Sequence, residues 1–146
     1  MFVQIVLGSM MVAITTMIQG MFMFVGVEHL RDHLSRSQTK SRLGSTLKIA
    51  VFVLWLFLAT ILEIWTWATL YLVLGAIGSL EQALYFSTVT FTTLGFGDIT
   101  LDETWRLLSS FEAANGLLMF GWSTALVFGA VQWVYERHHK PTDSGA

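Results

Sequence analysis

The stretch Thr92-Thr93-Leu94-Gly95-Phe96-Gly97-Asp98 decides the architecture of this chain, because segments apolar enough to cross a bilayer flank it on both sides. Its two glycines stand one residue apart, so the backbone there can hold conformations that residues with a Cβ reach only at a cost. Such a loop can point consecutive carbonyl oxygens toward one axis, and a ring of these loops replaces the hydration shell of a cation. The sequence therefore predicts an ion-coordinating loop between membrane segments.

The amino-acid composition indicates a membrane protein. Of the 146 residues, 54% are hydrophobic and 12% are charged, whereas about 25% of an average soluble domain is charged. A formal net charge of -2 without a basic stripe gives no indication of nucleic-acid binding, and the absence of cysteine excludes disulfides and zinc-thiolate sites. The sequence contains no nucleophile–base pair, phosphate loop or metal-ligand set, so we expect no enzyme activity and no cofactor.

Three apolar segments are each long enough for the roughly 20 residues that cross about 30 Å of hydrocarbon as a helix. They cover residues 1–27, 47–75 and 105–135. A half-polar segment at 83–93 is too short to cross and leads into the loop at 93–98. It predicts a re-entrant helix, because irregular backbone at membrane depth is tolerated only where protein or water satisfies it. The first segment lacks a basic start and a cleavage site, so we interpret it as a retained helix and not as a signal peptide.

The distribution of basic residues predicts the orientation of these segments. Five of the eight Lys and Arg lie between the first and second segments or at the very start of the second, and two follow the third: Arg31, Arg36, Lys40, Arg42, Lys48, Arg137 and Lys140. The positive-inside rule then places the linker of residues 28–46 and the C-terminal tail, residues 141–146, in the cytoplasm. The N-terminus and the glycine loop face the extracytoplasmic side. We expect a multi-pass protein of the cell membrane, in a prokaryotic inner membrane.

From residue 47 to residue 140 the chain resembles the pore module of tetrameric potassium channels, in the order outer helix, pore helix, filter and inner helix. The family pattern Thr-Val-Gly-Tyr-Gly-Asp appears here as Thr93-Leu94-Gly95-Phe96-Gly97-Asp98. Gly116 and Gly121 match inner-helix glycines where bending opens the cytoplasmic gate. The resemblance implies an all-α membrane protein with homotetrameric potassium-channel architecture, to which this chain adds an N-terminal transmembrane helix. Four chains are needed, because one loop cannot surround an ion.

The resemblance also implies the ion-binding residues. The carbonyls of Thr93, Leu94, Gly95 and Phe96, with the Thr93 hydroxyl, form successive cages for K⁺, and Gly97 carries the outer mouth. K⁺ is then the permeant ion and the metal bound at the filter. The expected partners are three identical subunits and membrane lipid.

Residues that support the filter depart from the family pattern. Tyr85 and Phe86 replace the more usual tryptophan pair of the pore helix, and Phe96 lacks the hydroxyl that the commoner tyrosine carries. Val89 stands where some members have a glutamate, so Asp98 needs another partner. These changes predict a filter with less hydrogen-bonded bracing.

One face of the inner helix carries a candidate pore-lining stripe. Leu117, Phe120, Thr124 and Phe128 recur at helical spacing after Gly116. By the resemblance, Leu117, Phe120 and Thr124 line the cavity and Phe128 is a candidate hydrophobic gate. The alternative is that this stripe packs against another helix.

Polar side chains within the apolar segments have no explanation in the resemblance. Glu63 and Glu112 lie at membrane depth, where an ionisable group costs roughly 2.5–3.5 kcal/mol and normally has a partner or a water path. Either could sense protons, but we favour a packing role in which each is protonated or bonded to hydroxyls. Four histidines, His29, His33, His138 and His139, could bind metal or sense pH, although solvation at the interface is the simpler interpretation.

The function that we expect is passive, potassium-selective conduction as a homotetramer. A weakly selective monovalent cation channel is the alternative within the channel class, because Phe96 could loosen the ion cages. The membrane subunit of a potassium-uptake transporter is a further alternative, but such systems usually carry several degenerate filters on one long chain.

Overall fold

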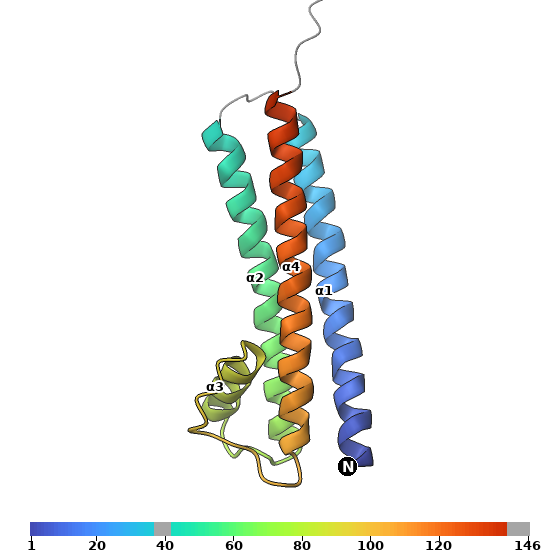
Figure 1. Cartoon of the computed structure of the whole chain (residues 1–146), viewed down its shortest axis with the longest axis vertical. Coiled ribbons are helices and arrows are strands. Elements are labelled where there is room, and N and C mark those ends of the chain that lie inside the picture. Colours follow the sequence, from blue (N-terminus) through green and yellow to red (C-terminus); the bar gives the residue numbers. More distant parts are fainter. Residues whose placement is uncertain (37–41, 140–146) are drawn as a thin grey trace, which may run out of the picture.

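The computed structural model describes residues 1–36 and 42–139. Four helices follow one another: α1 (Phe2–Arg36), α2 (Arg42–Val73), α3 (Leu80–Phe91) and α4 (Arg106–His139). Helices α1, α2 and α4 run side by side along the long axis, and the short α3 packs beside one end of α2 (Figure 1). The described residues contain no strand. The all-α fold predicted from the sequence is therefore confirmed.

Three helices are long and apolar enough to cross a membrane: Phe2–Arg31, Leu43–Val73 and Arg106–Glu136. They have 30 or 31 residues, which at 1.5 Å per residue exceeds the about 30 Å of a hydrocarbon core, so their ends project beyond it. The segment predicted as a linker at 28–46 is largely helical, because α1 continues to Arg36 and α2 begins at Arg42. Residues 28–36 contain no glycine or proline, and hydropathy marks where the apolar layer ends, which need not be where the helix ends.

Two local motifs turn the chain from α2 into α3. At the end of α2, Gly75 has a φ of 63° and its N–H donates to the Leu72 carbonyl at 3.0 Å, while the Ala76 N–H donates to the Tyr71 carbonyl at 2.9 Å. This pair of bonds is a Schellman cap, which requires the left-handed conformation that glycine reaches easily. Ser79 then caps α3, accepting a bond from the Gln82 N–H. The cap explains why α3 begins at Leu80, three residues before the segment predicted from hydropathy.

Helix α1 docks on the other helices through two glycine notches. The ring of Phe111 from α4 lies against Gly8, where a Cβ would come within 2.6 Å of it. The ring of Trp55 from α2 lies against Gly26 in the same way, at 2.8 Å, and its indole N–H donates to the Phe22 carbonyl at 2.9 Å. A side chain at either position would have to push the aromatic ring away.

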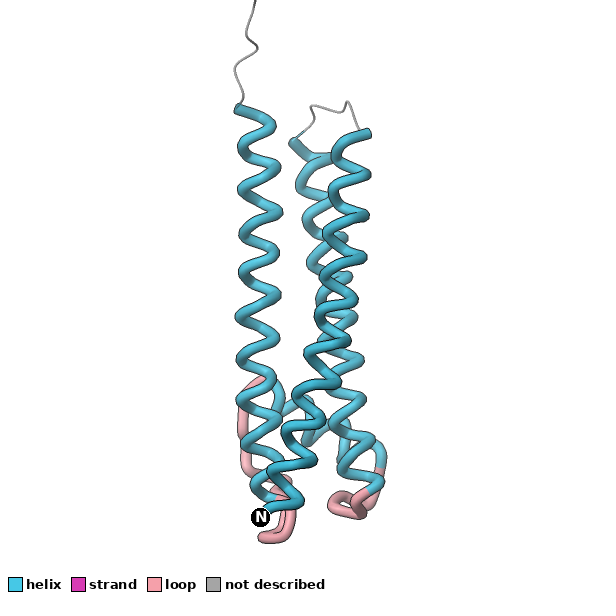
Figure 2. Tube along the Cα trace, turned by 90° about the vertical axis from the view of Figure 1, so that its right-hand side faces the viewer, coloured by secondary structure: helices cyan, strands magenta, loops and turns pink. Residues whose placement is uncertain are grey.

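Polar pairs also join α1 to α4 at membrane depth. The Asn115 amide donates to the Thr15 hydroxyl, and the Gln19 amide donates to the Ser123 hydroxyl, both at 2.7 Å. Thr15 and Gln19 are one turn apart and fully buried, so these polar side chains of α1 face α4. Figure 2 shows that the N-terminus lies at the same end of the bundle as the loops around α3. At this end the Gln4 side chain donates to the Thr104 carbonyl.

Candidate functional site

Helix α3 delivers the chain directly into the glycine loop. The Thr93 N–H donates to the Thr90 carbonyl at 2.9 Å, which continues the last turn of the helix. The Val89 carbonyl accepts two further bonds, from the Leu94 N–H at 2.9 Å and from the Gly95 N–H at 3.3 Å. Val89 is therefore a support of the loop through its backbone, while its side chain is buried. The sequence alone shows only that this position lacks a carboxylate side chain.

The loop backbone alternates in handedness. Thr93, Gly95 and Gly97 have φ values of 59°, 57° and 77°, whereas Leu94 and Phe96 between them are outside this positive-φ region. Alternating handedness turns successive peptide groups to the same side, the principle that also builds backbone nests. Thr93 is the one non-glycine residue with positive φ among the described residues, and such strain costs about 1–3 kcal/mol. The loop therefore keeps a strained threonine where a glycine would fit more easily.

Asp98 finds its partner on α3. The Tyr85 hydroxyl donates to Asp98 Oδ2 at 2.7 Å, and the Ile99 N–H donates to Oδ1 at 3.1 Å. The bond from Tyr85 holds the pKa of Asp98 below its usual value of 3.8, and the same bond raises the pKa of Tyr85. Phe86 points elsewhere, because it is buried in the core with its ring edge-on to Tyr71. Tyr85 thus supports the loop, whereas Phe86 packs in the core.

Glu112 lies fully buried where α2, α3 and α4 meet. The Tyr71 hydroxyl is 2.6 Å from Oε2, and Ser87 bonds to Oε1 while also lying 2.9 Å from the Ile64 carbonyl. Ser87 and Tyr71 have one hydroxyl proton each, so an ionised Glu112 leaves one of these three contacts without a proton. A proton on Glu112 itself supplies the third. Glu112 on α4 therefore joins α3, through Ser87, and α2, through Tyr71.

Glu63 has a different environment. It is fully buried on α2, and neither of its carboxylate oxygens has a hydrogen-bond partner among the described residues. It lies eight residues before Tyr71, about 12 Å along the helix, and directly before Ile64, whose carbonyl contacts Ser87. The indole N–H of Trp67, one turn away, is likewise without a partner in the described part of the chain.

Gly116 allows α4 to touch the end of α3. A Cβ at this position would lie 1.9 Å from the Phe91 carbonyl oxygen and 2.8 Å from its carbon. Gly121, in contrast, has nothing within 4 Å of its would-be Cβ. Helix α4 is continuous through both glycines, so bending at either one stays a prediction. The packing contact of Gly116 was not foreseen from the sequence.

The candidate pore-lining stripe lies on the uncovered face of α4. Leu117 and Phe128 are 61% and 62% exposed on this chain, and Thr124, whose hydroxyl donates to the Phe120 carbonyl, is also exposed. The Phe120 ring packs edge-on against Phe91, which connects this face to the end of α3. The loop residues Leu94 and Phe96 are exposed as well, by 58% and 65%.

The histidines form no metal site in the part of the chain that is described. No group of three His, Cys, Asp or Glu that could hold a metal occurs among those residues. His29 is exposed on α1 and lines a groove between α1 and α2. The side chains of His33, His138 and His139 lie outside the described part.

Comparison with known proteins adds one match. A family model described as "Ion channel" matches residues 50–132, which is more than half of the chain. The matched residues include α3, the glycine loop and most of α2 and α4, whereas α1 lies outside them. No curated protein and no solved structure matches the chain.

Proposed function

Because the chain belongs to this ion channel family, we propose that it conducts K⁺ passively as a homotetramer through a filter formed by Thr93–Gly97. The observation that carries the proposal is the alternation of backbone handedness at Thr93, Gly95 and Gly97 within a Thr-Leu-Gly-Phe-Gly-Asp sequence. Carbonyls turned to one side by such a backbone replace water around a K⁺ ion. The loop starts at the C-terminus of α3, whose partial negative charge favours a cation.

The uncovered surfaces of the chain support a tetramer. Only 11% of the spanning window of α4 is buried within the chain, compared with 28% for α1 and 33% for α2. Leu94 and Phe96 of the loop are also exposed, and one loop cannot surround an ion. Neighbouring copies would cover these apolar faces, and α4 would line the conduction path with Leu117, Phe120 and Thr124, ending at Phe128.

Two contacts supply bracing that the sequence pattern lacked. Tyr85 holds Asp98 just beyond the filter, and the Val89 carbonyl holds the N–H groups of Leu94 and Gly95. Glu112, bonded to Ser87, would fix α3 from behind. Potassium selectivity then rests on a filter fixed at its outer end and at its base, although Phe96 brings no hydroxyl.

The weakly selective cation channel is the second candidate. It is favoured by the exposed Phe96 ring, which has no polar atom with which to brace the loop. In both cases we propose that the N-terminus and the filter face the extracytoplasmic side of a prokaryotic inner membrane, and that the end with Arg31 and Lys48 faces the cytoplasm.

Reconstitution of the purified protein in liposomes tests the proposal. Potassium flux without nucleotide, blocked by barium, is expected, with a reversal potential that shifts when Na⁺ replaces K⁺. A reversal potential that does not move would reject potassium selectivity and favour the second candidate. Flux that requires a nucleotide or another subunit would favour an uptake transporter instead.

A further inference from the structure

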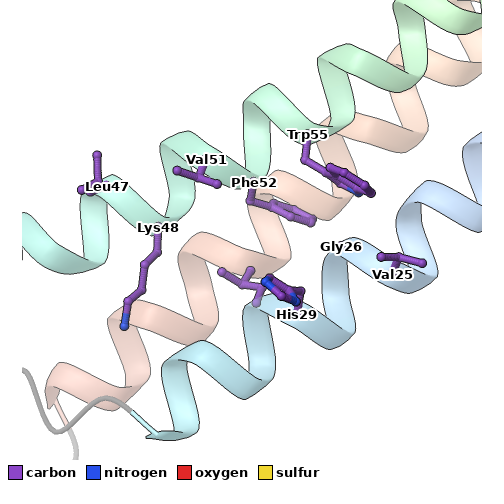
Figure 3. Close-up of a pocket in the computed structure, with 9 residues that line it drawn as sticks. Val25, Gly26, His29, Leu47, Lys48, Val51, Phe52 and Trp55 are labelled. Carbon is purple, nitrogen blue, oxygen red and sulfur yellow. The ribbon is translucent and has the colours of Figure 1, made fainter.

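A groove of about 520 Å³ lies between α1 and α2, at the end of the bundle away from the filter. Its walls are apolar and include Val51, Phe52 and Trp55 from α2. Figure 3 shows Lys48 of α2 at one end of this groove and His29 of α1 across from Phe52. The volume is within the about 300–1,000 Å³ typical of small-ligand sites.

The groove opens away from α4. Its lining residues come from α1 and α2 alone. Two of them, Leu30 and Phe52, also belong to the apolar cluster that joins these helices to α4 through Leu56 and Ala130. In Figure 3 the faint orange ribbon of α4 passes behind the side chains of Phe52 and Trp55. If α4 lines the conduction path, as proposed above, the groove faces the surrounding lipid.

Basic residues lie around the groove. Lys48 and His29 line it, and Arg31 is exposed two residues further along α1. The acidic residues in this part of α1 are Glu28 and Asp32, whereas Arg31, Arg36, Lys40, Arg42 and Lys48 give residues 28–48 an excess of basic residues. On the proposed orientation this part of the groove is at the cytoplasmic surface, where anionic lipid headgroups lie and basic pockets between helices bind them. The (CH₂)₄ stem of a lysine can lie along apolar surface while its ammonium reaches the phosphate.

We propose that this groove binds one anionic phospholipid, with an acyl chain along Val51, Phe52 and Trp55 and the phosphate beside Lys48 and His29. The site is formed with α1, which is outside the residues that match the channel family. The proposal rests on the orientation proposed above, but lipid binding can be measured without conduction.

Native mass spectrometry of the assembled channel tests this site by counting the lipids retained in the presence of phosphatidylglycerol or phosphatidylcholine. Lys48→Gln is expected to lower phosphatidylglycerol affinity about fivefold, equivalent to about 1 kcal/mol, and Lys48→Arg to preserve it. Arg31→Gln is the matched control, because it removes the same charge from the same end but outside the groove. Val51→Trp fills the groove from a position that is 59% exposed, so retention of both lipids should fall.

Three results would overturn the proposal. Equal retention of the two lipids by the wild-type channel would remove headgroup recognition. Equal losses in Lys48→Gln and Arg31→Gln would show attraction to the basic surface as a whole. A Val51→Trp channel that retains its lipid but changes its subunit number would show that a second copy of the chain occupies the groove. Potassium flux through the same preparations is a separate readout, so failure of conduction would count against the proposed function alone.

Discussion

Substituting Gly116 by alanine tests whether α4 positions the filter. The added Cβ would lie 1.9 Å from the Phe91 carbonyl oxygen, about 1.5 Å short of the 3.4 Å at which ordinary contact begins. Because Phe91 ends α3 and Thr93 begins the proposed filter two residues later, α3 must move and take this loop with it. Functional sites tolerate displacements of about 0.5 Å, so a shift near 1.5 Å should abolish selective conduction.

Gly116→Ala should reduce the stability of the folded protein only modestly, even though it abolishes selective conduction. Overpacking typically costs about 1–3 kcal/mol, against which alanine regains up to about 1 kcal/mol over glycine within a helix. We therefore expect Gly116→Ala to assemble with modestly reduced thermal stability and to lose K⁺ flux. Gly121→Ala is the matched control, since nothing lies within 4 Å of its new Cβ on the same chain.

Reconstituted flux and reversal potentials, measured on preparations with equal amounts of assembled channel, distinguish packing from bending. A hinge at Gly116 predicts a changed open probability with unchanged selectivity. Wild-type flux and wild-type K⁺ preference in Gly116→Ala would refute the reasoning, because the carbonyl of Phe91 would then not be fixed by α4.

Three further predictions concern the groups around the filter. Glu112→Gln should keep the thermal stability and the pH dependence of current, because an amide can donate to Ser87 and accept from Tyr71. Glu112→Ala should lower the free energy of unfolding by about 1–3 kcal/mol, because it leaves two buried hydroxyls unpaired. Equal melting temperatures of the two variants would contradict this. Tyr85→Phe removes the hydrogen bond that lowers the pKa of Asp98, so Asp98 should become protonated at a higher pH in the variant than in the wild type. As the extracytoplasmic pH falls, the K⁺ current of the variant should therefore change at a higher pH; superimposable pH profiles of current would exclude this effect. Thr93→Gly should not lower the melting temperature, because it removes a left-handed threonine conformation that costs about 1–2 kcal/mol. It should reduce the rise in melting temperature that K⁺ produces, because the hydroxyl expected to bind the ion is lost. An unchanged rise would show that the hydroxyl does not bind the ion.

The broad plan of the molecule could be predicted from the sequence because it depends on local signals. The long apolar runs gave three spans, and the paired glycines marked a loop whose positive φ values are found at Gly95 and Gly97. The family match confirms that the chain is an ion channel. Helix ends were predicted less well, since α3 starts at a serine cap and α1 continues past its apolar part.

Contacts between helices could not be predicted in the same way. Tyr71 bonds to Glu112 across 41 residues of chain, and the pairing depends on how α2 and α4 are rotated about their axes, which hydropathy does not record. The partner of Asp98 was closer at hand, because a tyrosine hydroxyl stood at position 85 in place of the usual tryptophan. The packing role of Gly116 could not be predicted, because the sequence does not distinguish a glycine that allows bending from a glycine that allows close contact with another helix.

The glycine notches on α1 have a consequence for how the channel is assembled. Gly8 and Gly26 receive rings from α4 and α2, and hydrogen bonds from Thr15 and Gln19 lie between them, so contacts along its whole length position α1 in addition to its connection to α2. We therefore expect α1 to dock in the correct position even when it is a separate polypeptide. A chain cut between α1 and α2 and synthesised as two polypeptides should therefore recombine in the bilayer, with each notch finding its ring.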